Sequence, residues 1–251
     1  MASLPIRFTV CTYNIWTNTR WPERRAALQG FVASHLPDVL CLQEVIPDSR
    51  AALDEVLLPT HQRVDDAFEG WSNEGNIYWN TAFFEMAAYD AEQIGILETL
   101  RRLFWVRLNL RDGSGRTLLV STAHYTYSGH PEAIASEKNV RMPQARETIA
   151  ALARVAHADE PTLFMGDLND TNQPIHILRE GGLQDCFTAL GRYAPNTWPA
   201  MPTSKGPQQT IDWMLHRGPI QPMTAEVVDY YLDDLAPSDH KPLLATYQFK
   251  Q

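Results

Sequence analysis

Several short segments of this 251-residue sequence place an acidic, amide or imidazole side chain at the end of an apolar, strand-like run. These residues are Asn14, Glu44, His124, Asp167, Asn169, Asp212, Asp239 and His240. A rigid sheet builds a polar site when several strands each deliver one such side chain to the same end. Carboxylate and amide oxygens suit Mg²⁺ or Mn²⁺, whereas the Cys/His spacing of a zinc site is missing from the sequence. The residue types therefore predict a hard-cation site.

The elements that must position these residues follow from hydrophobic patterning and turn signals. The sequence predicts strands over 6–14, 38–44, 77–83, 103–110, 117–124, 162–167, 211–216, 225–228 and 243–249. It predicts helices over 21–35, 49–58, 142–156 and 174–180. Segment 112–115, Asp-Gly-Ser-Gly, is typical of a hairpin turn.

The order of these elements predicts an α/β fold in which two sheets pack face to face with helices outside. A simple alternating Rossmann order does not fit, because no Gly-rich phosphate loop follows the first strand. No repeat, low-complexity tract or linker divides the sequence, so we expect a single catalytic domain over residues 1–251.

The overall charge bears on possible partners. The formal net charge is −9, and the sequence has only four lysines and no long basic run. Duplex binding usually needs a basic stripe, so nucleic acid is possible but not favoured, although bound metal ions could supply positive charge locally. The 44% hydrophobic content excludes a mostly disordered chain. Nothing in the sequence implies a protein partner.

The cysteines and the apolar runs bear on location. Three cysteines are too few, and odd in number, for a disulfide scaffold in a chain of this length. Cys11 and Cys41 lie within apolar runs and are expected to be buried thiols. No run reaches the ~20 apolar residues of a membrane span, and the first residues do not have the pattern of a signal peptide. We expect a soluble, cytoplasmic protein.

The same polar segments resemble the motifs of the endonuclease/exonuclease/phosphatase superfamily of deoxyribonuclease-I-like metal-dependent phosphoesterases. They occur in that family's order and span nearly the whole sequence. The matching segments are Thr-Tyr-Asn (12–14), Leu-Gln-Glu (42–44), Thr-Ala-His (122–124), Gly-Asp-Leu-Asn (166–169), Ile-Asp (211–212) and Ser-Asp-His (238–240). The resemblance implies a four-layered α/β sandwich with two mixed sheets, and hydrolysis of a phosphoester.

The resemblance also implies residue roles around the metal ion and the attacking water. Glu44 would bind Mg²⁺ or Mn²⁺, with Asn14 and Asp239 close by as further metal-site residues. The metal would neutralise phosphate oxygens and stabilise charge in the transition state. Asp167 would orient and deprotonate the water, and Asn169 would hydrogen-bond the phosphoryl group.

Two histidines complete the implied machinery. His240 would donate to a non-bridging phosphate oxygen, and Asp212 would fix its ring and favour its charged form. His124 would bind the phosphate or assist the leaving oxygen, with Glu74 as the carboxylate that orients it. Many DNA-repair members of the family have a tyrosine at the position of His124, which argues against an abasic-site endonuclease.

Aromatic and cationic residues around the predicted site are candidates for contacts with a substrate. Segment 125–143 is long for a strand-to-helix connection, so it is either a substrate-shaping loop or a loop with its own packing. The candidates are Trp16, Tyr125, Arg141 and Trp198, with Trp71 and Trp79 as further aromatics near the mouth and Arg101-Arg102 as a weaker candidate for phosphate. Such rings stack on a base, enclose an apolar leaving group or pack in the core.

Three functions remain open from the sequence. The favoured one is a metal-dependent phosphodiesterase acting on a small or lipid-like substrate. The alternative is a nuclease of the same chemistry acting on DNA or RNA. A non-catalytic binding protein on this scaffold is disfavoured, because none of the catalytic positions is lost.

Overall fold

The computed structural model describes residues 6–250, which form seven helices and twelve strands. The helices are α1 (Arg25–His35), α2 (Pro47–Leu57), α3 (Gly70–Asn73), α4 (Pro131–Ala135), α5 (Arg141–Val155), α6 (Gln173–Glu180) and α7 (Cys186–Ala189). The strands are β1 (Arg7–Asn14), β2 (Val39–Gln43), β3 (His61–Arg63), β4 (Gly75–Asn80), β5 (Phe84–Glu92), β6 (Leu103–Leu110), β7 (Thr117–His124), β8 (Thr162–Asp167), β9 (Gln184–Asp185), β10 (Asp212–Arg217), β11 (Ile220–Val227) and β12 (Leu243–Phe249).

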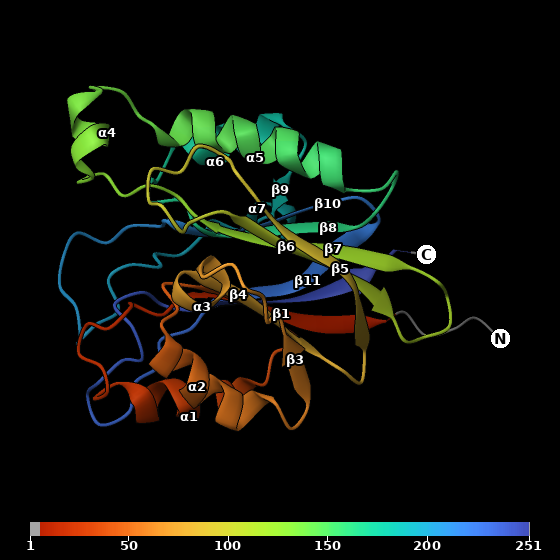
Figure 1. The fold of residues 1–251 in the computed structure, drawn as a ribbon, viewed down its shortest axis with the longest axis horizontal. Coiled ribbons are helices and arrows are strands. Elements are labelled where there is room, and N and C mark those ends of the chain that lie inside the picture. The colour runs from red at the N-terminus through yellow and green to blue at the C-terminus, as the bar shows by residue number, and fades with distance from the viewer. Residues whose placement is uncertain (1–5, 251) are drawn as a thin grey trace.

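The strands form two six-stranded mixed sheets. The first has the order β11-β12-β1-β2-β4-β3, and the second has the order β5-β6-β7-β8-β10-β9. Within the sheets, β1 pairs with β2 and β7 pairs with β8 in parallel, while the other pairs are antiparallel. In Figure 1 the sheets face each other, with α1 and α2 outside one sheet and α5 and α6 outside the other. This arrangement confirms the predicted α/β sandwich.

Three apolar clusters hold the layers together. The largest fills the space between the two sheets and includes Val10, Val106 and Met165. A second packs β7, β8 and β10 against α5 and α6, and a third packs β1 and β2 against α1 and α2. Strands β2 and β8 are buried at every position, which explains their continuous apolar sequences. The central strands of both sheets are therefore covered on both faces.

The predicted element boundaries are wrong at two places that matter. The helix predicted over 21–35 begins only at Arg25, because the preceding segment forms turns in which Trp16, Thr17 and Arg20 adopt positive φ. The strand predicted over 77–83 ends at Asn80, and a further strand, β5, follows it. Strand β5 is an edge strand with many partly exposed residues, so its hydrophobic pattern is weak. Within residues 6–250, no helix is long and apolar enough to cross a membrane.

Candidate functional site

The centre of the candidate site lies where β7, β8 and β10 run side by side. His124 ends β7 and pairs with Asp167, the last residue of β8. Asp167 pairs in turn with Asp212, the first residue of β10. Side chains at paired positions of neighbouring strands point to the same face of a sheet. Three residues separated by up to 88 positions in sequence are therefore neighbours through sheet register.

Gly166 allows the close strand approach that this register requires. Its φ is +141°, and a Cβ at this position would lie 2.0 Å from the carbonyl oxygen of Ala123 on β7. Any other residue would push β7 and β8 apart directly beside His124 and Asp167. The glycine of the Gly-Asp-Leu-Asn segment thus has a steric role.

The first sheet brings Asn14 and Glu44 to the same place, through the parallel pairing of β1 with β2. The Asn14 amide nitrogen donates to Glu44 Oε1 at 3.2 Å and to Asp167 Oδ2 at 3.1 Å, so it links the two sheets. Its oxygen accepts the backbone N–H of Trp16 at 3.0 Å. Asn14 thus lies beside Glu44, as predicted for a metal-site residue, and in this geometry its N–H₂ group faces the site and positions two carboxylates.

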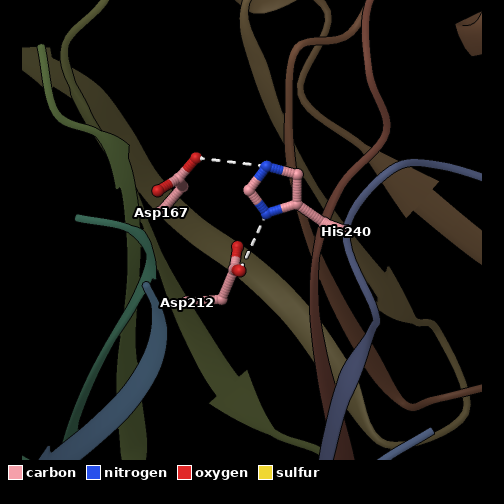
Figure 2. Close-up of side chains that lie close together, drawn as sticks. All are labelled: Asp167, Asp212 and His240. Atoms are coloured by element: carbon pink, nitrogen blue, oxygen red, sulfur yellow. Dashed lines mark hydrogen bonds and ion pairs between the residues drawn. The ribbon is translucent and has the colours of Figure 1, made fainter. Parts of the chain in front are cut away.

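His240 lies between two carboxylates, as Figure 2 shows. Its Nδ1 is 2.8 Å from Asp212 Oδ2, and its Nε2 is 3.7 Å from Asp167 Oδ2. Burial would lower the pKa of His240, but Asp212 and Asp167 raise this pKa well above its usual range. The ring therefore carries a proton at neutral pH. These three residues are close enough to hold a metal ion, but the imidazolium already balances both carboxylates.

Asp167 is the most heavily contacted carboxylate of the site. Its Oδ2 lies 3.3 Å from His124 Nε2, and its Oδ1 accepts the backbone N–H of Asn169 at 2.8 Å. Burial alone would raise the pKa of the Asp167 carboxyl, but the charges of His124 and His240 hold this pKa below its usual range. Asp167 is consequently ionised at any physiological pH.

Glu44 and Asp239 form the part of the site with an excess of negative charge. Burial raises the pKa of Asp239, and the nearby charge of Glu44 raises this pKa further, although His240 acts in the opposite direction. Trp198 Nε1 donates to Asp239 Oδ2 at 3.2 Å. Two carboxylates that line one pocket and whose charges interact offer hard oxygen donors, which fit a divalent cation such as Mg²⁺ or Mn²⁺.

A pocket of about 510 Å³ connects these groups with the solvent. Predicted site residues on its wall are Trp16, Glu44, His124, Asp167, Asn169, Trp198, Asp239 and His240. Asp212 and Asn14 lie behind the wall and contact residues that line it. The structure thus brings together most of the residues that the sequence analysis selected.

Several predicted contacts are wrong. Tyr125 is fully buried and its hydroxyl lies 2.6 Å from Thr148 Oγ1, so its ring cannot meet a ligand in the pocket. Arg141 contacts Asp170 and the Thr126 carbonyl, and it does not line the pocket. The side chains named above as further aromatics near the mouth, Trp71 and Trp79, are buried in the core between the sheets.

Glu74 also differs from its predicted role. It accepts from Arg101 Nε at 3.1 Å, while His124 Nδ1 has no hydrogen-bond partner among residues 6–250. Arg101 is held by Glu74 and by Glu98, and it is the only arginine or lysine among the described residues that line the pocket. In the sequence, Arg101 is only a weak candidate for phosphate binding because an apolar strand follows it. Tyr127, in segment 125–143, also lines the pocket and is 45% exposed.

A two-sheet sandwich with histidines and carboxylates gathered at one end of its strands is suited to metal-assisted phosphoester hydrolysis. Residues 11–240 match the sequence profile of the Endonuclease/Exonuclease/phosphatase family, and the chain belongs to this family. It is accordingly a phosphoric ester hydrolase, in a family that generally depends on a divalent metal ion.

Solved structures support the same fold. D. rerio TDP2 in complex with a single-strand DNA product is 19% identical with a TM-score of 0.78, over 96% of this chain and 98% of that one. The human Nocturnin catalytic domain with bound sulfate is 18% identical with a TM-score of 0.76, over 98% and 95% of the two chains. A mannosyl-6-phosphatase from Bacteroides thetaiotaomicron is 20% identical with a TM-score of 0.75, over 96% and 100%. A search of curated protein sequences finds no significant match.

Proposed function

We propose that this protein is a Mg²⁺- or Mn²⁺-dependent phosphodiesterase that acts on a compact substrate, in a single catalytic domain. The observation that carries the proposal is the pocket in which Glu44, Asp239, Asp167 and two histidines meet. A free phosphate diester needs charge neutralisation, an oriented water and a proton donor, and these side chains are suited to all three tasks.

Glu44 and Asp239 are the residues proposed to hold the metal ion. When bound, a divalent cation neutralises phosphate oxygens and stabilises the negative charge of the transition state. Asn14 keeps the Glu44 carboxylate in place through its amide N–H, and Trp198 does the same for Asp239. These donors leave further carboxylate lone pairs available to a cation.

Asp167 is the proposed partner of the attacking water. Its depressed pKa makes it a weak base, so it contributes first by orienting the water and accepts the proton as the new P–O bond forms. Its contacts with Asn14 and His124 hold the carboxylate in one orientation. Asn169 lines the pocket beside it and is proposed to contact the phosphoryl group.

His240 is the proposed donor to a non-bridging phosphate oxygen. Asp212 keeps its Nδ1 proton and ring orientation fixed, and the raised pKa maintains the positive charge. His124 also lines the pocket and is proposed to bind the phosphate or to assist the leaving oxygen. Trp16 and Trp198 are the aromatic side chains proposed to contact the organic groups of the substrate.

The preference for a compact substrate follows from charge. A protein that grips several phosphates needs several cations, and its affinity then falls steeply with salt. This protein has a net charge of −9, and Arg101 is the one arginine or lysine on the described pocket wall. Nuclease activity is the alternative, favoured by the likeness to a TDP2 that was crystallised with a DNA product.

The decisive experiment compares substrates under one set of conditions. Bis(4-nitrophenyl) phosphate, single-stranded DNA and plasmid DNA are incubated with Mg²⁺ or Mn²⁺ and with EDTA. We expect turnover of the small diester that EDTA abolishes, with slower cleavage of DNA. Faster cleavage of DNA would favour the nuclease, and full activity in EDTA would refute metal-dependent hydrolysis.

We also propose a cytoplasmic location. All three cysteines, Cys11, Cys41 and Cys186, are free and buried. Free thiols in this number are typical of a reducing compartment. The location is tested by detecting the labelled protein in the fractions of lysed cells. Recovery of the protein outside the cytoplasmic fraction would refute the proposed location.

A further inference from the structure

A second hollow of about 570 Å³ lies beside the candidate active site. Arg179 at the end of α6 and Arg192 after α7 line it, together with the hydroxyl and amide side chains of several neighbouring residues. None of its described lining residues is acidic. In a protein with a net charge of −9, a hollow with two arginines and no carboxylate is suited to an anion.

Both guanidinium groups are held in place with donors left over. Arg179 bonds to the buried Asp185 at 2.8 Å and lies over the Trp213 ring at 5.6 Å. Arg192 donates its Nη1 to the Ala225 carbonyl at 2.8 Å and lies over the Phe187 ring. Within residues 6–250, neither Arg179 Nη1 nor Arg192 Nη2 makes a hydrogen bond, and Arg192 has no ion pair. Preorganised guanidinium donors bind phosphate oxygens well.

One extended segment, residues 207–211, separates the hollow from the active-site pocket. Its backbone pairs with Trp198 through Gln209 in an isolated β-bridge, with N–O distances of 2.7 and 3.0 Å. Pro207 and Ile211 face the active-site pocket, Gln208 and Thr210 face the hollow, and Gln209 lines both. Alternating residues face opposite sides, as in a strand. A ligand that extends across Gln209 would therefore occupy both pockets.

We propose that the hollow binds a second phosphate of the substrate, next to the phosphate that is hydrolysed. This inference rests on the proposed function, and it defines the preferred substrate as a compact molecule with two phosphates. Tyr193 is 98% exposed beside Arg192, and its ring offers a face on which an organic group between or beyond the phosphates can stack.

The test uses pairs of substrates that differ by one phosphate. Thymidine 5′-(4-nitrophenyl phosphate) is compared with its 3′-phosphorylated form, and the 3′-(4-nitrophenyl phosphate) with its 5′-phosphorylated form. In one of the two pairs, we expect kcat/KM to be roughly tenfold higher for the substrate that carries the second phosphate. One charge-assisted hydrogen bond accounts for a gain of this size. Arg192→Gln should bring this ratio toward one, and Arg192→Lys should restore part of it.

The matched control is Arg146→Gln, which removes the same charge from an exposed position on α5. This variant should keep the wild-type ratio. If the wild-type enzyme is active but its kcat/KM is the same with and without the second phosphate in both substrate pairs, the second phosphate site is refuted. The proposed function would remain intact. A ratio that keeps rising when further nucleotides are added would overturn the compact substrate in favour of a strand.

A binding measurement separates this inference from catalysis. Calorimetry compares thymidine 3′,5′-bisphosphate with the two thymidine monophosphates, which requires no turnover. Tighter binding of the bisphosphate, weakened by Arg192→Gln and unchanged by Arg146→Gln, would support the hollow even if the 4-nitrophenyl esters were not hydrolysed. Equal affinities for all three ligands would refute it.

Discussion

Replacement of Asp167 by asparagine tests the centre of the site most directly. The two side chains have the same shape, so the change removes the charge and one acceptor but little volume. An asparagine can keep its oxygen toward the backbone N–H of Asn169, where Asp167 Oδ1 accepts at 2.8 Å. Its N–H₂ group would then face Asn14 Nδ2 and His124 Nε2, which now lie 3.1 and 3.3 Å from Oδ2. Hydrogen-bond donors would then face each other, and the two contacts at Oδ2 would be lost.

The expected magnitudes follow from these contacts. A charge-assisted hydrogen bond contributes ~1.5–3 kcal/mol, and the loss at Oδ2 is partly offset because no carboxylate has to be buried, so we expect a net loss of about 2–3 kcal/mol. For a chain of this size such a loss lowers Tm by about 5–10 °C. The catalytic loss should be ~10²-fold or more in kcat, because a group that orients and deprotonates water contributes at least this much.

The pH dependence gives a second measure of the same change. The pKa of Asp167 is depressed in the folded protein, so its stabilising contribution is complete above the unfolded pKa of about 3.9 and is lost as the pH falls through the folded pKa. The difference in stability between wild type and Asp167→Asn should therefore be constant from neutral pH to mildly acidic pH. It should shrink only in strong acid.

The assays are steady-state hydrolysis of bis(4-nitrophenyl) phosphate, calorimetric unfolding and circular dichroism. Asp159→Asn is the matched control, because Asp159 is exposed and its φ of +58° is one that asparagine tolerates. A folded Asp167→Asn protein that retains more than about a tenth of wild-type kcat would refute the role assigned to Asp167. A variant more stable than wild type would refute the electrostatic account.

Four further results are expected. EDTA should abolish activity and Mg²⁺ or Mn²⁺ restore it, and Glu44→Gln should raise the Mg²⁺ concentration needed by ~10-fold or more; an unchanged requirement would remove Glu44 from the metal site. His240→Ala should lower kcat by ~10²-fold, and wild-type activity should persist through neutral pH and fall as the pH rises through the raised pKa of His240. Glu160→Gln breaks a buried ion pair with Arg107 at 2.8 Å and should cost ~3–5 kcal/mol in urea unfolding, and a loss under 1 kcal/mol would contradict this. Burial lowers the pKa of His216 to about 4, so stability should decrease as the pH falls from about 6.5 to about 4, less steeply in His216→Gln.

The position of the candidate site could be predicted from local patterns in the sequence. Asp167 follows an apolar run that forms β8, and His124 and Asp212 also stand at ends of predicted strands. A polar residue at the end of a buried strand is a local signal, since burial of the strand depends on its own apolar side chains. The two-sheet sandwich was likewise predictable, because strand and helix patterns follow each other along the sequence.

Strand boundaries and side-chain direction were harder to predict. Tyr125 directly follows His124, and successive side chains at a strand end point to opposite faces, so the ring enters the core under α5 while His124 enters the pocket. Edge strand β5 escaped prediction because its partly exposed residues produce no clear alternation. The partners of Glu74 and Arg141 depend on loops that no local pattern specifies.

The sequence by itself determined which residue types stand at strand ends, and these types predicted a hard-cation site. Only the tertiary structure decided which of them meet. Sheet register sets His124, Asp167 and Asp212 side by side, and the facing of the two sheets brings Asn14 to Asp167 across 153 positions of sequence. Such pairings arise from packing between distant segments, and no property of either segment alone encodes them.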